Sequence, residues 1–197
     1  MRIAINHMTE TAQKHSGKKI ARVELLIPET VSIILQNNKI LVKGPKGDCE
    51  RSFSERMSRV SQEDSKLIIT SDKAGKKTKK LVKAKAAHIR NMIRGVQEGH
   101  HYTMKICSGH FPMNVSIVKD ELVVKNFLGE KVPRIIKLKK GATVKVEGDK
   151  IVIESPNKEI AGQVSADIEL LTKRANFDTR IFQDGIFIIE KDGKSVM

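Results

Sequence analysis

Residues 157–191 read NKEIAGQVSADIELLTKRANFDTRIFQDGIFIIEK and decide the fold of this chain. The first half of this stretch predicts an amphipathic helix, because apolar residues recur at intervals of three and four. These residues are Ile160, Val164, Ile168 and Leu171. Asn157 is a favoured N-cap residue, and Glu159 in the first turn complements the helix dipole. The run IFII at residues 186–189 follows an Asp-Gly pair and predicts a strand.

A polar, basic turn joins this helix to this strand. It carries Lys173, Arg174, Asn176, Asp178 and Arg180. A connection held between two buried elements provides a platform for contacts to phosphate groups. A solvated loop is the alternative that the stretch alone leaves open.

The remaining chain contains a repeat of short strands. Pro28 and the VSI at residues 31–33 recur as Pro112 and the VSI at residues 115–117, an offset of 112 − 28 = 84. KLII at residues 66–69 and KIVI at residues 150–153 have the same offset. A lysine-rich connection and a helix at residues 81–96 follow the first KLII. One face of this helix is predicted to carry Val82, Ala86, Ile89, Ile93 and Val96, with Lys79, Lys83, Lys85 and Arg90 largely elsewhere. We interpret the strand HYTMKIC, residues 101–107, as the closing strand of the first half.

We therefore predict an α+β fold, a tandem duplication of a small antiparallel sheet covered by one helix. The predicted segments are an N-terminal extension at 1–21, a first repeat at 22–108, a second repeat at 109–191 and a tail at 192–197. The extension is polar and aperiodic, as expected of a flexible leader or of an arm that orders on its target.

The charge indicates a polyanionic partner. Lys and Arg number 37 against 23 Asp and Glu, a formal net charge of +14, and nucleic acid is the first candidate. A membrane fits poorly, since the apolar runs are short and no spanning segment or secretory signal is indicated. Aromatic residues are only 4% of the chain, so recognition by shape and backbone is expected rather than stacking of bases.

No catalytic constellation, metal site or cofactor motif is indicated. Cys49 and Cys107 belong to no CxxC pair, and a reducing compartment is the default. Three histidines, His100, His101 and His110, are expected at the surface or facing RNA. GPKG at residues 44–47 is too short for a phosphate-binding loop and predicts a plain turn. Asp178 and Asp184 lie near cations that favour their ionised forms, which does not suit general acid catalysis.

Several longer motifs resemble the universal large-subunit ribosomal protein L-six family, in its archaeal and eukaryotic branch. They are NMIRGV at 91–96, HFPMNV at 110–115, NFLGEK at 126–131 and NxDxRxFxDGIF at 176–187. The resemblance covers residues 22–191, and the absence of eukaryote-like insertions favours an archaeal source.

The resemblance implies a non-enzymatic, cytoplasmic protein of the large ribosomal subunit that binds its rRNA mainly through the second repeat. The implied place is the base of the lateral stalk, beside neighbouring ribosomal proteins and close to the site of translational GTPases. The rRNA-facing residues that it implies are Asn126, Gly129, Lys131, Arg134, Lys137, Lys140, Lys173, Arg174, Asn176, Asp178, Arg180 and Phe182.

Two other functions remain to be weighed. A free regulator that binds mRNA or tRNA would carry the same basic loops and differ only in its partner. An enzyme that handles phosphate would need a nucleophile with its base, or a set of metal ligands, and the sequence offers neither.

Overall fold

The computed structural model describes residues 14–15, 18–19, 21–36, 39–53, 58–63, 65–71, 73, 75–178 and 180–196. Two compact units divide the chain between Glu98 and Gly99, earlier than the predicted boundary at 108/109. Most of the predicted N-terminal extension lies outside the described residues. Within that extension, β1 (Lys14–His15) pairs with β2 (Lys18–Lys19).

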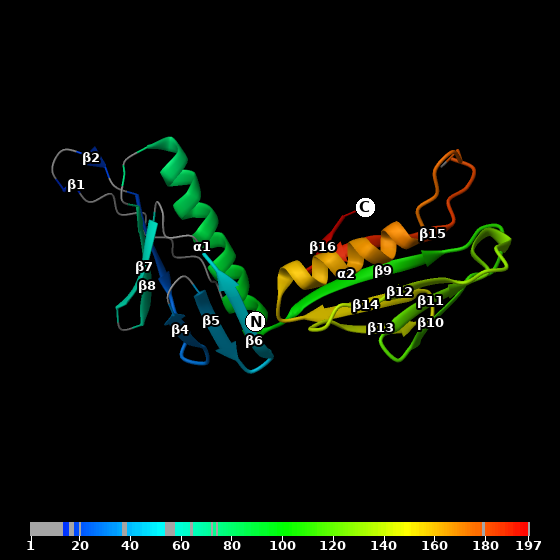
Figure 1. Cartoon of the computed structure of the whole chain (residues 1–197), viewed down its shortest axis with the longest axis horizontal. Helices are drawn as coiled ribbons and strands as arrows, with labels where there is room; N and C mark the ends of the chain where they lie inside the picture. Colours follow the sequence, from blue (N-terminus) through cyan, green and yellow to red (C-terminus); the bar gives the residue numbers. More distant parts are fainter. Residues whose placement is uncertain are drawn as a thin grey trace. The chain divides into compact units, whose positions relative to one another are not determined.

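The first unit contains two three-stranded antiparallel sheets and one helix (Figure 1). One sheet has the order β4-β5-β6, formed by Ser32–Gln36, Lys39–Gly44 and Gly47–Ser52. The other has the order β3-β8-β7, formed by Arg22–Leu26, Lys66–Ser71 and Ser58–Glu63. Both sheets place apolar side chains against the helix α1 (Lys76–Gln97) in one core.

The buried face of α1 is the predicted one, with Val82, Ala86, Ile89, Ile93 and Val96 in the core. The prediction that Lys85 lies away from this face is wrong, since only 5% of Lys85 is exposed. Its Nζ donates a hydrogen bond to the carbonyl of Ser58 at 3.4 Å. The hydrocarbon part of a lysine side chain can lie among apolar groups while its amino group finds a carbonyl.

The GPKG motif is the turn between β5 and β6, as predicted, and it packs on the end of α1. The backbone N–H of Lys46 donates to the carbonyl of Val96 at 2.9 Å. A Cβ on Gly44 would come within 2.8 Å of both the Val96 carbonyl oxygen and its Cγ2. Glycine at position 44 therefore allows the close approach of turn and helix.

We expect Gly44→Ala to destabilise the first unit by about 1–3 kcal/mol, because the added methyl group overlaps helix backbone. Gly162→Ala in the second unit is the matched control. Its Cβ would meet the Tyr102 ring at 3.7 Å, an ordinary contact inside a helix, so a gain of about 0.5–1 kcal/mol is expected. Urea unfolding followed by circular dichroism measures both, and equal effects of the two variants would contradict the explanation.

The second unit repeats the plan with a larger sheet. The three-stranded sheet β10-β11-β12 is formed by Asn114–Val118, Glu121–Lys125 and Arg134–Lys137, with a short 3-10 turn η1 (Phe127–Gly129) after β11. The five-stranded sheet β13-β14-β9-β15-β16 is formed by Thr143–Glu147, Lys150–Ser155, His100–Cys107, Gly185–Lys191 and Lys194–Ser195. Helix α2 (Lys158–Leu171) covers this unit's core.

The strand at residues 100–107 does not close the first unit. As β9 it lies at the centre of the second unit's sheet, where Met104 is opposite both Ile151 of β14 and Ile188 of β15. All three of these side chains belong to the core of the second unit. The counterpart of β9 in the first unit is β3, which pairs with β8 as β9 pairs with β14.

The N-terminus of α2 is capped as predicted. Asn157 Oδ1 accepts a hydrogen bond from the backbone N–H of Glu159 at 2.9 Å. Val164 and Ile168 are fully in the core, whereas Ile160 and Leu171 pack at its margin. The helix therefore has a fixed start, and its end leads directly into the basic turn.

Residues 192–197 were predicted to be a tail, but β16 pairs with β15 and Asp192 contacts the ring of His100. His100 is completely buried, and its Nδ1 lies 2.8 Å from Asp192 Oδ2. The expectation of a surface or RNA-facing role is thus wrong for His100. No helix in the described part of the chain is long and apolar enough to cross a membrane.

Candidate nucleic-acid interface

The basic loop after α2, residues 172–184, is anchored at both ends by buried polar side chains. Thr172 Oγ1 donates to the carbonyl of Glu169 at 3.2 Å and accepts from the N–H of Ile186 at 3.0 Å. At the other end, Asp184 Oδ1 accepts from the N–H groups of Gly109 and His110, at 2.7 and 3.0 Å. Asp184 thereby ties the loop to the segment between β9 and β10.

Asp184 also contacts the His110 ring, with Oδ2 at 2.6 Å from Nδ1. Burial alone would raise the pKa of Asp184, but the hydrogen bonds from His110 and Gly109 together lower that pKa below its usual value. The carboxylate is therefore held ionised by His110 and Gly109. The sequence analysis instead predicted that nearby cations, namely Lys173, Arg174 and Arg180, would favour the ionised form.

Two aromatic rings of the basic loop, Phe177 and Phe182, form a series of contacts with His110. Phe182 stacks on His110 with ring centroids 4.9 Å apart, and Phe177 meets Phe182 edge to face at 5.0 Å. The Arg174 guanidinium lies 4.2 Å from the centroid of Phe177. This series of contacts runs from the anchored base of the loop to its cationic side, and it gives the loop a defined shape.

The tip of the loop is organised by Asp178. Its Oδ1 accepts from the backbone N–H of Arg180 at 2.9 Å, and its Oδ2 lies 2.9 Å from Arg180 Nη2. The hydrogen bonds from Arg180 lower the pKa of Asp178, and the same pairing raises the pKa of Arg180. Asn176 has φ 65°, a left-handed conformation that asparagine tolerates well.

A second loop, residues 126–134, joins β11 to β12 and contains η1. Asn126 has φ 59° and its Nδ2 donates to the carbonyl of Pro112 at 3.0 Å. Leu128 and Gly129 also have positive φ, at 48° and 77°. Three such residues in four positions make a tight turn, which places Gly129 and Lys131 at the surface.

Arg134 fixes this second loop to the end of α2. It donates to both carboxylate oxygens of Glu130, at 2.8 and 2.7 Å, and to the carbonyl of Leu171 at 2.7 Å. Its guanidinium also lies 4.4 Å from the ring centroid of the buried Phe127. The hydrogen bond from Arg134 is the main cause that lowers the pKa of Glu130.

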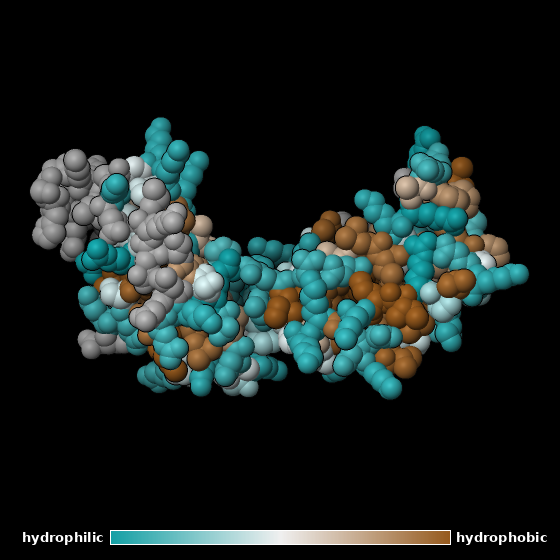
Figure 2. Space-filling view, viewed as in Figure 1, coloured by the Kyte–Doolittle hydropathy of each residue, from teal (hydrophilic) through white to brown (hydrophobic). Residues whose placement is uncertain are grey.

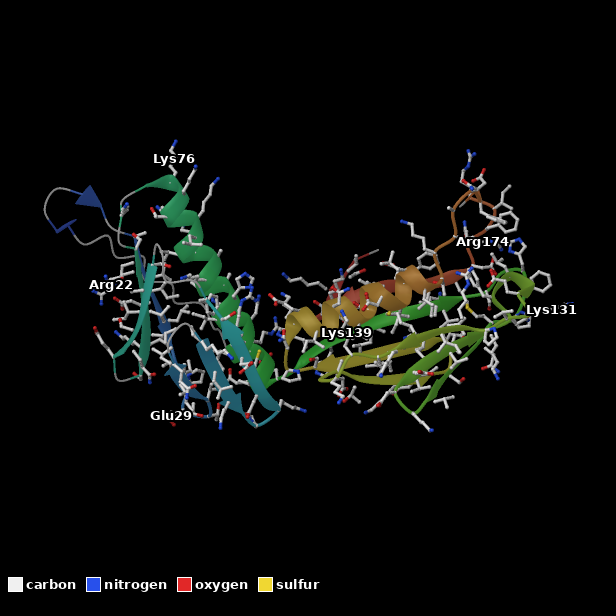
Figure 3. The ribbon with its side chains drawn as sticks, viewed as in Figure 1. Arg22, Glu29, Lys76, Lys131, Lys139 and Arg174 are labelled. Atoms are coloured by element: carbon white, nitrogen blue, oxygen red, sulfur yellow. The ribbon has the colours of Figure 1, made fainter. Side chains whose placement is uncertain are left out.

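The two loops meet through Glu130, because Arg174 Nη1 lies 3.9 Å from Glu130 Oε1. Figure 3 shows Lys131 and Arg174 at the same end of the second unit, with Lys139 farther along it. Figure 2 shows hydrophilic and apolar atoms interleaved over the loop that follows α2. We call this end, formed by residues 109–112, 126–134 and 172–184, the loop end.

Most of the residues that the sequence predicted as rRNA-facing lie at the loop end. They are Asn126, Gly129, Lys131, Arg134, Lys173, Arg174, Asn176, Asp178, Arg180 and Phe182. Lys137 and Lys140 do not lie there. Lys137 is at the far end of β12, opposite Glu121, and Lys140 precedes Gly141, which packs near Ile160 in the first turn of α2.

The loop-end residues divide into two kinds. Asn126, Arg134, Asp178 and Phe182 are engaged with other parts of the protein and shape the loops. Lys131 and Lys173 are exposed, and among the described residues neither forms an ion pair. These two lysines are therefore available for an anion without loss of an internal contact.

Two roles at the loop end were missed by the sequence prediction, those of His110 and Asp184. Their contact joins positions separated by 74 residues. No local pattern indicates it, although both residues lie in the motifs quoted above. Phe111, the neighbour of His110, is also at this end and is 49% exposed.

Within the described ranges, no group of three or more His, Cys, Asp or Glu side chains is placed to hold a metal ion. Cys49 is buried, and both cysteines are free thiols.

Comparison with known proteins matches both halves of the chain to one family. The model of that family, described as ribosomal protein L6, matches residues 27–99 and again residues 111–185. The double match confirms the duplication inferred from the 84-residue offset.

Three archaeal relatives are similar over most of their length, and each is named large ribosomal subunit protein uL6. The protein of Methanobrevibacter smithii is 42% identical over 87% of this chain and 96% of its own. That of Ignicoccus hospitalis is 43% identical over 84% of this chain and 92% of its own. That of Methanosarcina mazei is 43% identical over 88% of this chain and 98% of its own.

Proposed function

Since this chain belongs to the ribosomal protein L6 family, we propose that it is a structural constituent of the large ribosomal subunit and binds large-subunit rRNA through the loop end. The proposed place is the base of the lateral stalk, near neighbouring ribosomal proteins and translational GTPases, as the family resemblance implies. The protein acts there in the cytoplasm as a non-enzymatic clamp on rRNA.

The observation that carries the proposal is that two exposed lysines lie on two anchored loops, and that neither lysine forms an ion pair among the described residues. Lys131 and Lys173 adjoin Glu130 and Arg174, the residues through which the loops meet. Phosphate contacts made by a preformed surface need little ordering of the protein on binding. The net charge of +14 supports the same class of partner.

We expect the double variant Lys131→Gln, Lys173→Gln to bind rRNA more weakly without loss of stability. If each lysine neutralises one phosphate, the slope of log affinity against log salt falls by roughly 1.4–1.8. Filter binding to protein-free large-subunit rRNA from Methanosarcina mazei at several salt concentrations measures this slope. The control is the double variant Lys43→Gln, Lys46→Gln, which removes the same charge from exposed positions of the first unit. An equal change of slope in the control would mean that net charge, and not the position of the lysines, causes the effect.

Sedimentation tests the function itself. Cell extract is separated on a sucrose gradient before and after a high-salt wash, and the protein is followed by immunoblot. Salt-resistant cosedimentation with the large subunit is expected of a structural constituent. Recovery in light fractions, or on polysomes only before the wash, would favour the free regulator of mRNA or tRNA.

A further inference from the structure

Phe111 is half exposed, and its aromatic ring packs on the backbone of Gly129. A Cβ placed on Gly129 would lie 3.5, 3.6 and 3.8 Å from Cε2, Cζ and Cδ2 of this ring. Three ring atoms at similar distances mean that a face of the ring lies over the Gly129 backbone. Gly129 has φ 77°, a conformation that favours glycine, and because glycine has no Cβ the Phe111 ring can lie close to its backbone.

The backbone on both sides of Phe111 is fixed by hydrogen bonds from distant parts of the second unit. Asp184 accepts from the N–H groups of Gly109 and His110, and Asn126 donates to the carbonyl of Pro112. Phe111 is thus the one position between these two sets of hydrogen bonds, which fix the backbone that carries its ring. A ring that is already ordered loses little entropy when a partner binds it.

The ring contributes little to the core of the protein. Phe111 is 49% exposed and lies outside the buried cluster of the second unit. Among the described residues it forms no contact with another aromatic ring, in contrast to His110, Phe177 and Phe182. An aromatic ring held in place with one open face is the arrangement that proteins use to stack unpaired bases.

We propose that the open face of Phe111 receives an unpaired nucleobase of the bound RNA, while Lys131 on the adjoining loop contacts phosphate. Cations adjoin the ring, because Lys131 follows the supporting turn and Arg174 lies at the same end of the second unit (Figure 3). This inference rests on the proposed function and specifies the RNA as a loop, bulge or junction rather than a continuous duplex. It differs from the expectation of recognition by shape and backbone rather than by stacking of bases.

The test compares Phe111→Leu with Phe111→Trp in the full chain, using the same protein-free large-subunit rRNA as probe. Leucine keeps an apolar side chain but has no ring to stack, so affinity is expected to fall about tenfold to hundredfold. Tryptophan keeps a stacking face and is expected to bind within about threefold of the original chain. The salt slope should remain unchanged in both, because no cation is removed. Urea unfolding verifies that each variant is as stable as the original.

Ultraviolet crosslinking of the unsubstituted chain gives a second measurement that does not depend on the variants. A nucleotide adduct on Phe111, located by mass spectrometry, is expected. Equal affinity of Phe111→Leu together with no adduct would overturn the proposal. If Phe111→Leu binds naked rRNA normally but fails to enter reassembled subunits, the ring contacts a neighbouring protein, and the proposal is likewise wrong. If the original chain does not bind this rRNA at all, the proposed function fails first.

Discussion

Asp184→Ala is expected to destabilise the second unit by about 3–5 kcal/mol, because three hydrogen-bond donors lose a buried carboxylate acceptor. The substitution leaves the N–H groups of Gly109 and His110, and the His110 ring nitrogen, without their acceptor. It also releases the basic loop from the segment that presents Phe111. We therefore expect rRNA affinity to fall together with stability.

Urea unfolding and amide hydrogen exchange at residues 109 and 110 measure this effect. Asp178→Ala is the matched control, since it removes an exposed carboxylate from the same loop and should leave the unfolding midpoint unchanged. Unaltered exchange at 109 and 110 in Asp184→Ala would show that Asp184 does not anchor the loop.

The same carboxylate makes stability depend on acid pH. Its pKa is lower in the folded protein than in the unfolded chain, so its stabilisation is complete above the unfolded value of about 3.9. That stabilisation is lost as the pH falls through the lower, folded pKa. The free energy of unfolding should therefore fall more steeply below about pH 4 in the original chain than in Asp184→Ala.

Arg134→Ala is the second substitution with a large expected effect, a destabilisation of about 2–4 kcal/mol. It removes two hydrogen bonds to Glu130, one to the Leu171 carbonyl and the contact with the Phe127 ring. Arg134→Lys should recover only part of this, because an ammonium group cannot form the two parallel bonds to Glu130. Thermal unfolding of the three proteins gives the order of stability.

Comparing Arg134→Ala with Lys131→Ala distinguishes a residue that stabilises the fold from a residue that only contacts RNA. Lys131→Ala should unfold as the original chain does and bind rRNA more weakly, whereas Arg134→Ala should lose both properties. If Arg134→Ala kept the original stability and lost only rRNA affinity, Arg134 would be a direct phosphate ligand rather than a residue that holds the loop.

The sequence was sufficient for the two helices and for the duplication, because these depend on local patterns. Periodicity located α2 and the buried face of α1, and residue types located the N-cap Asn157 and the turn at residues 44–47. Local patterns could not show that β9 belongs to the sheet of the second unit. Its alternation predicts a strand, but its partners are β14 and β15, which lie far along the chain.

The loop end could be located by its cations but not resolved into roles. Arg134 and Lys131 are close in sequence and similar in charge, yet Arg134 contacts Leu171 across 37 residues and Lys131 faces solvent. The burial of His100 and Lys85 could not be predicted for the same reason. Their hydrogen-bond partners, Asp192 and Ser58, are distant in the sequence. Residue type indicates what a side chain can bind, and the tertiary contacts decide which partner it has.

The position of β9 has a consequence for the synthesis of the protein. In the described part of the chain, no strand of the first unit pairs with a strand beyond Glu98. Every described strand of the first unit therefore has its pairing partner once residue 98 has left the exit tunnel of a translating ribosome. At elongation rates of about 5–20 residues per second, it has several seconds to fold before β15 emerges and completes the second sheet. The nascent chain can thus acquire its two units in sequence, with only the second waiting for the C-terminus.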